Sequence, residues 1–156
     1  MATPPYIAEL RRHVGHAPLW LMGANVLVVR DGEVLLVRRS DTGEWAPIGG
    51  IVDPGENPAE TAAREALEEA GVHIEVERLL WLVVNEPLTY PNGDVCQFLD
   101  HGFRARWIGG EARVGDDEST DVRWFPVDDL PEPRRSRLDA MVAVALADPR
   151  DVALDL

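Results

Sequence analysis

The chain of 156 residues contains no lysine, a single cysteine and no long apolar run. All of its basic residues are arginines, which excludes Schiff-base chemistry and a P-loop lysine. With Cys96 alone, the chain cannot form an internal disulfide or a cysteine-rich zinc site. The N-terminal residues have no apolar signal region, and no run approaches the ~18 apolar residues of a membrane span. We therefore expect a cytoplasmic protein that does not bind membranes.

Positive charge is also scarce. The 15 arginines are opposed by 28 acidic residues, which gives a formal net charge of −13. Such a field repels polyanions, so we expect no binding of a nucleic-acid polymer. A small phosphorylated ligand is compatible with this charge where arginines, backbone N–H groups or a metal ion reverse it locally. The length predicts one domain over residues 1–156.

Hydrophobic periodicity predicts strands with helices before, between and after them, which indicates a mixed α/β domain. The expected elements are a helix or arm within 1–20, two strands within 21–40 joined by Asp31-Gly32, a loop or irregular strand over 41–50, a helix over 57–70, strands over 73–87 and 102–110 with an Asn-Gly turn near 92, a short strand over 122–127, and an amphipathic helix over 134–148.

The helix over 57–70 has the best-defined ends. Asn57 suits the N-cap and Pro58 the first helical position, and Glu60 stands three residues after the cap, as in a capping box. Gly71 provides the C-terminal stop. Alanines on one side of this helix predict that it packs closely against a sheet.

Three glutamates lie on the other side of the same helix near its C-terminal end. At 100° per residue, Glu65, Glu68 and Glu69 fall within an arc of about 100°. Like charges at this spacing are unfavourable by ~0.2–0.5 kcal/mol per pair, and acids in the last turn also oppose the helix dipole. A solvated acidic surface would explain the cluster by itself. A divalent cation would instead turn the repulsion into coordination, since Mg²⁺ prefers carboxylate oxygens.

The flanking residues favour the cation. Residues 50–72 read GIVDPGENPAETAAREALEEAGV. The pattern Gly, five residues, Glu, seven residues, Arg-Glu-apolar-any-Glu-Glu-any-Gly-apolar resembles the signature of the Nudix hydrolase family at every fixed position. The resemblance implies a single Nudix-fold domain, a mixed β-sheet sandwiched between helices (α/β/α). The preceding Trp45-Ala-Pro-Ile-Gly-Gly is similar to the family's Trp-any-Leu-Pro-Gly-Gly, with the proline one place earlier.

The resemblance also implies an activity. Nudix enzymes use Mg²⁺ or Mn²⁺ to hydrolyse a phosphoanhydride bond in a nucleoside diphosphate derivative, a reaction that depends on charge neutralisation and positioning of water. The alternative is a Nudix-like sensor module that binds a nucleotide without cleaving it. An ADP-ribose-like molecule and a nucleoside triphosphate are both open as substrates, because Pro87 and Tyr90 come close to the patterns of two different subfamilies. Family members are often dimers, so a homodimer is the expected assembly if the chain oligomerises.

Roles for individual residues follow from the same resemblance. The implied metal ligands are Glu65 and Glu69, with Glu68 as a ligand or the water-activating base and the Gly49 carbonyl as a further ligand. Glu56 and Arg64 are implied to orient these carboxylates from outside the metal shell. Many family members place another acid on a later loop, as a metal ligand or a general base, and Glu118 in GDDESTDVRW is our choice over Asp116 and Asp117. A solvated turn rich in acids is the alternative explanation of this segment.

Candidates for substrate binding are less specific. Four strand arginines are candidate phosphate ligands, although an exposed strand residue is the more common explanation for each: Arg38, Arg39, Arg104 and Arg106. Arg39 is the best candidate, because it precedes the Trp-Gly-Gly loop. We expect Arg39 and Arg104 to bind the substrate. Gly50 in the glycine loop and Trp45, as a stacking surface for a base, are further candidates.

Overall fold

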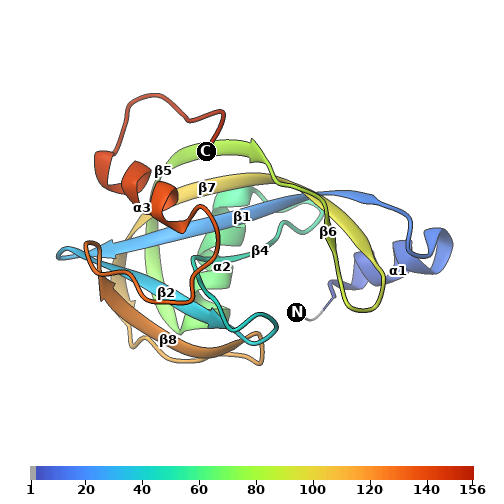
Figure 1. Cartoon of the computed structure of the whole chain (residues 1–156), viewed down its shortest axis with the longest axis horizontal. Coiled ribbons are helices and arrows are strands. Elements are labelled where there is room, and N and C mark those ends of the chain that lie inside the picture. The colour runs from blue at the N-terminus through green and yellow to red at the C-terminus, as the bar shows by residue number, and fades with distance from the viewer. Residues whose placement is uncertain (1–2) are drawn as a thin grey trace.

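A computed structural model describes residues 3–156 and shows one mixed sheet of eight strands with three helices around it (Figure 1). The elements are α1 (Pro5–Val14), β1 (Leu19–Arg30), β2 (Glu33–Arg39), β3 (Trp45–Ala46), β4 (Ile48–Ile51), α2 (Pro58–Ala70), β5 (Val72–Val84), β6 (Leu88–Thr89), β7 (Val95–Gly110), β8 (Ser119–Pro126) and α3 (Leu138–Ala147).

The sheet is organised around β1, which has neighbours along both edges. The main path runs β3-β2-β1-β7-β5, with β4 added to β1, β6 to β7 and β8 to β2. The predicted hairpin between β1 and β2 is confirmed, and Asp31 and Gly32 at its tip both adopt positive φ. In contrast, β1 and β7 are parallel over eleven residue pairs, with Val26 opposite Phe103. This pairing joins residues 77 positions apart, such as Val26 and Phe103, and no turn signal in the sequence predicts it.

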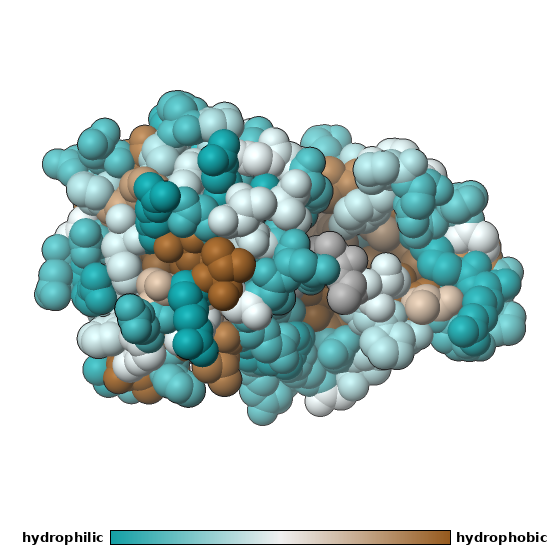
Figure 2. Space-filling view, turned by 90° about the horizontal axis from the view of Figure 1, so that it is seen from below, coloured by the Kyte–Doolittle hydropathy of each residue, from teal (hydrophilic) through white to brown (hydrophobic). Residues whose placement is uncertain are grey.

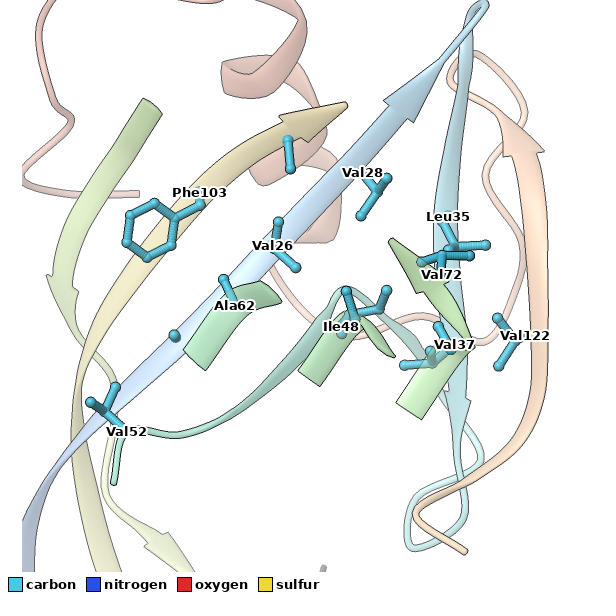
Figure 3. Close-up of a cluster of buried hydrophobic side chains, with 14 residues drawn as sticks. Val26, Val28, Leu35, Val37, Ile48, Val52, Ala62, Val72, Phe103 and Val122 are labelled. Carbon is cyan, nitrogen blue, oxygen red and sulfur yellow. The ribbon is translucent and has the colours of Figure 1, made fainter. Parts of the chain in front are cut away.

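Two hydrophobic clusters lie on opposite faces of this sheet. Alternate residues of β1 and β2 point to different faces, so that Val26 packs towards α2 whereas Leu27 packs towards α3. Figure 3 shows the first cluster, in which strand side chains such as Val26 and Phe103 pack with the small Ala62 of α2. The helices therefore cover both faces, and the predicted α/β/α arrangement is confirmed.

Helix α2 begins and ends where its sequence predicts. Asn57 is the N-cap, and its backbone N–H donates a hydrogen bond to the Glu60 carboxylate at 2.9 Å. Gly71 adopts φ 70° and caps the last turn. The alanines Ala62, Ala66 and Ala70 are fully buried, which lets the helix lie close to β4 and β5 and places its acidic side at the edge of the sheet.

Helix α3 buries the side predicted from its sequence, including Leu138 and Met141, but it starts later than the expected residue 134. The residues just before α3 are hydrogen-bonded to the backbone of Trp45 in β3. The Trp45 N–H donates to the Pro133 carbonyl, and the Trp45 carbonyl accepts from the Arg135 N–H. This segment is therefore extended alongside β3. The helix begins only after Arg137, which has φ 70°.

The outer surface is largely polar on the face that Figure 2 shows. Hydrophobic residues on this face are gathered in small groups between polar ones. Within residues 3–156, no helix has the length and apolar character needed to cross a membrane.

Candidate active site

The candidate site lies where the acidic side of α2 faces the glycines of β4. Strand β4 pairs with β1, with Gly49 opposite Asn25 and Gly50 opposite Ala24. A Cβ atom added to Gly50 would overlap the Glu65 side chain, and one added to Gly49 would overlap Asn25 and the Ala24 carbonyl. Gly49 requires glycine because the Ala24 backbone carbonyl leaves no room for a side chain, whereas a side chain at position 50 would have to displace Glu65.

Glu69 is the most deeply buried acid of the cluster, with 4% of its surface exposed. Its carboxylate accepts a hydrogen bond from the Ser119 hydroxyl at 2.8 Å and one from the Gly49 backbone N–H at 3.4 Å. Both donors are neutral. Burial raises the Glu69 pKa to about 7, and the hydrogen bonds offset only part of this effect.

Glu65 is also largely buried, although it touches a cation. The Arg64 guanidinium donates to its carboxylate at 2.8 Å. Burial nevertheless raises the Glu65 pKa to about 7, because desolvation outweighs the attraction of Arg64, and the nearby acids Glu118 and Glu68 raise the pKa further. The repulsion predicted from the helix spacing is therefore present in the folded protein.

Arg64 links the acidic residues of this region. Its guanidinium also donates to Glu56 at 3.0 and 3.1 Å and to the exposed Glu68 at 3.0 Å. Glu56 accepts a further bond from the Thr61 hydroxyl at 2.7 Å. The pKa of Glu56 is consequently lowered to about 2, chiefly by the hydrogen bonds from Arg64. Glu56 and Arg64 thus form a charge-assisted network that holds α2 against the loop before it.

The donor set suits a hard divalent cation. Glu65 and Glu69 are carboxylates that lack sufficient positive charge, and carboxylate oxygens are the ligands that Mg²⁺ and similar ions prefer. Within residues 3–156, no three acidic, histidine or cysteine side chains converge on one point. Glu65 and Glu68 are instead turned towards Arg64, and Glu69 towards Ser119. The three glutamates have the right ligand atoms for the ion, while their hydrogen-bond partners in this structure are Arg64 and Ser119.

Two cavities meet at this region and share Gly50 and Ile51 of β4 as a common wall. The first, of about 350 Å³, contains the acids Glu65, Glu68 and Glu118. The second is larger, about 490 Å³, and Glu69 lies on its wall. The buried carboxylates therefore stand between two hollows, an arrangement that lets one ligand contact both sides of the glycine strand.

Comparison with known proteins decides the family. The profile described as the NUDIX domain matches residues 20–144, which is most of the chain. The chain belongs to the Nudix hydrolase family. Residues 50–72 are thus its Nudix box, and the expected enzyme class, a pyrophosphohydrolase, is the class that its relatives support.

Individual relatives differ in how much of them this Nudix chain covers. It is 35% identical over 130 residues to a "MutT-like protein" of Streptomyces ambofaciens, covering 83% of this chain and 76% of that protein. It is also 35% identical to "NAD-capped RNA hydrolase NudC" of Stutzerimonas stutzeri over 76% of this chain, but it spans only 41% of that longer protein. The crystal structure of MutT NUDIX hydrolase from Burkholderia pseudomallei superposes with a TM-score of 0.64 at 31% identity, covering 80% of this chain and 97% of that one.

The structure brings most of the predicted site residues to the two cavities. The three clustered glutamates of α2, Arg64, the glycines of β4 and Glu118 line these cavities, whereas Glu56 lines neither of them and is bonded to Arg64. Arg39 lines the second cavity, where it forms two hydrogen bonds with Asp41 at 2.8 and 2.6 Å. These placements agree with the predicted roles without testing them.

Two predicted substrate ligands lie elsewhere. Arg104 of β7 donates to Glu77 at 2.7 Å and to the Ala145 carbonyl of α3 at 2.7 Å, and it lines neither cavity. Trp45 is 6% exposed and packs edge-on against Phe125 in the cluster under α3. Strand alternation directs both side chains to the face opposite the Nudix box, so we withdraw both as substrate ligands.

Other contributors were missed. Ser119 and Thr61 donate to the acids of the site, and Asn25 and Asp100 line the second cavity. Asp100 is buried and accepts hydrogen bonds from Asn25 at 2.5 Å and from Trp81 at 2.8 Å. The sequence contained one indication of this group, because Asn25 lies within an apolar strand, where a buried amide needs a hydrogen-bond partner.

Proposed function

We propose that this protein is a Mg²⁺- or Mn²⁺-dependent hydrolase that cleaves a phosphoanhydride bond in a nucleoside diphosphate derivative. The single observation that carries the proposal is the pair Glu65 and Glu69, two buried carboxylates whose pKa values are raised to about 7 beside a cavity. Glu65 accepts one hydrogen bond from Arg64, which does not offset its burial, whereas Glu56 accepts two and its pKa is lowered to about 2. An unfavourable pair in a cleft points to a function.

The ligands of the ion would be Glu65 and Glu69, with Glu68 and the Gly49 carbonyl as further oxygen donors. When bound, the ion supplies positive charge to the phosphates and lowers the pKa of a coordinated water. Arg64 would release Glu65 while keeping Glu56, because its two bonds to Glu56 are separate from its bond to Glu65. The Glu56–Arg64 pair would thereby keep α2 in place through the reaction.

A general base must remove a proton from the attacking water. Glu68 and Glu118 both line the first cavity, and both are carboxylates within this acidic group. The backbone N–H of Glu118 donates to the Asp116 carboxylate at 2.9 Å, and the Glu118 carbonyl accepts from the Ser40 N–H. These two bonds fix the backbone of the loop that carries the Glu118 side chain. Variants of the two acids would separate their roles, since loss of the base lowers kcat more than KM.

The larger cavity would hold the remainder of the substrate. Its wall combines Tyr90 and Phe98 with the polar groups of Asn25 and Asp100, a mixture suited to a nucleoside or sugar. We favour an ADP-ribose-like molecule or a nucleoside triphosphate. The NudC relatives are named for NAD-capped RNA, but this chain spans under half of those proteins and carries a net charge of −13. We therefore keep a small nucleotide as the substrate.

Catalysis must be distinguished from simple binding, because a Nudix-like sensor would also hold a nucleotide. All the carboxylates of the Nudix box are present, which favours the enzyme. The test is product release from ADP-ribose, NAD⁺, NAD-capped RNA and nucleoside triphosphates with Mg²⁺ or Mn²⁺, and again with chelator. Metal-dependent turnover that Glu69→Gln abolishes would support the enzyme, with Glu60→Gln on the exposed side of α2 as the matched control. Binding without turnover of any compound would support the sensor instead.

A cytoplasmic location, a homodimer and one domain over residues 1–156 stay predictions. The first two call for fractionation of cells and for measurement of the mass in solution.

A further inference from the structure

The second cavity contains two arginines, of which only one is paired. Arg39 and Arg135 both lie on its wall. Arg39 is bonded to Asp41 through two nitrogens. In the described part of the chain, residues 3–156, the guanidinium of Arg135 forms neither a hydrogen bond nor an ion pair. A half-buried guanidinium with five unused donors is an uncommon arrangement, because arginine is seldom removed from water without a partner.

The backbone holds Arg135 firmly in this place. Its N–H donates to the Trp45 carbonyl at 2.9 Å, and its carbonyl accepts from the Leu138 N–H at 3.1 Å. Trp45 and Leu138 are both buried in the cluster under α3. The position of Arg135 is thus fixed by the core, independently of what its side chain touches.

The surroundings of Arg135 do not satisfy its charge. Burial lowers the pKa of Arg135, and the neighbouring Arg39 lowers it further, while Asp100 and Glu44 offset only part of this. Asp100 is already committed, since both of its oxygens accept hydrogen bonds from other side chains. The two guanidinium groups therefore repel each other across the cavity, and the Glu44 carboxylate on its wall attracts Arg135 without forming a hydrogen bond or an ion pair with it.

We propose that Arg135 is a substrate-binding residue and that it receives a phosphate of the nucleotide in the second cavity. This inference rests on the proposed function and deepens it, since it places a phosphate group of the substrate in the second cavity together with the nucleoside or sugar. A guanidinium fork matches phosphate oxygens, and a phosphate placed beside Arg39 and Arg135 would remove the repulsion between them. Gly50, shared by both cavities, leads from this position to the acids of the Nudix box.

The two cavities are then complementary. The acids of the first cavity need a cation, whereas the two arginines of the second cavity need an anion, which they would hold without a metal. A phosphate monoester should consequently bind to the second cavity in the presence of a chelator, under conditions in which the acidic side contributes nothing. The neutral nucleoside should bind much more weakly, because it leaves Arg135 without a partner.

The experiment measures the affinity of AMP, ribose 5-phosphate and adenosine by calorimetry, with the full chain in EDTA. For Arg135→Met we expect the affinity for AMP to fall about tenfold or more, the loss of a charged hydrogen-bond pair, with an intermediate value for Arg135→Lys. The melting temperature should not fall, since the wild-type guanidinium makes no bond that the fold loses. The neighbouring Arg134→Met is the matched control, because Arg134 is paired with Glu132 and Asp139 outside both cavities. Its affinity for AMP should stay within about twofold of wild type.

The inference would be overturned if Arg135→Met bound AMP as tightly as wild type, or if adenosine bound as well as AMP. It would be overturned equally if wild type bound neither phosphate compound without metal. Hydrolysis with Mg²⁺ is measured on the same preparations. If the protein hydrolyses its substrate but Arg135→Met binds AMP as tightly as wild type, this inference alone is contradicted. If Arg135→Met weakens AMP binding but no hydrolysis occurs, the proposed function alone is contradicted.

Discussion

Glu56 lies just before α2 and Glu69 lies in the last turn of α2, and their environments shift their pKa values in opposite directions. Glu56 receives two hydrogen bonds from Arg64 and one from Thr61, and its pKa is lowered to about 2. Glu69 receives bonds only from the Ser119 hydroxyl and a backbone N–H, and its pKa is raised to about 7. Neutral donors do not replace a cation when a carboxylate leaves water. One acid is part of the scaffold, and the other is left in need of positive charge.

The largest effect should come from removing the charge of the second acid. Glu69→Gln should lower kcat by more than about 100-fold, because even the outer partners of a metal ligand are worth 10–100-fold. The same change should leave the metal-free protein as stable as wild type or more so, since a neutral amide is less costly to bury. Steady-state kinetics and thermal melting in EDTA check both signs. A parallel loss of activity and stability would mean that Glu69 is merely structural.

Removing the charge of the first acid should give the opposite pattern in stability. Glu56→Gln should destabilise the fold by about 2 kcal/mol, because Arg64 loses its best partner and Glu56 is only 18% exposed. Urea unfolding in the presence of EDTA measures this directly. If Glu56→Gln and Glu69→Gln shifted the midpoint equally, the contrast between the two acids would be wrong.

Stability of the metal-free protein should fall as pH rises from about 4.5 to about 7. Over this range the folded protein keeps protons on Glu65 and Glu69 that the unfolded chain has released, so each step upward in pH favours unfolding. Buried Asp100 acts in the same direction. Glu56 has the reverse sign: its contribution is complete above pH about 4.5 and is lost as pH falls towards 2. Melting curves across pH should show a decline on the order of 1–3 kcal/mol that added Mg²⁺ reduces.

A smaller effect should follow from crowding the acids without changing their charge. In Gly50→Ala the new Cβ would displace the Glu65 side chain, and we expect kcat to fall about tenfold. Gly109→Ala is the control, since a Cβ there meets no atom within 4 Å and the residue has no positive φ. Equal kinetics in the two variants would show that the close approach of β4 to Glu65 has no role in the reaction.

Much of this arrangement could be predicted from local sequence. The limits of α2, the β1–β2 hairpin and the gathering of acids on one side of α2 depend on residues within a few positions of one another. The relative places of distant segments could not be predicted. Strand β7 pairs in parallel with β1, which brings Asp100 to the second cavity and carries Arg104 away from it. The sequence predicts Arg135 at the start of a helix, yet it precedes α3, and a hydrogen bond from its N–H to the Trp45 carbonyl holds it at a cavity wall.

The most direct measurement is the binding of Mn²⁺ to wild type and to the Glu65→Gln/Glu69→Gln double variant at pH 7.5, by calorimetry in two buffers of different ionisation enthalpy. We expect saturable binding to wild type with release of protons, since the ion must displace them from acids that titrate near pH 7, and no such binding to the double variant. Binding of equal affinity in both proteins would contradict the assignment of these two acids as the metal site.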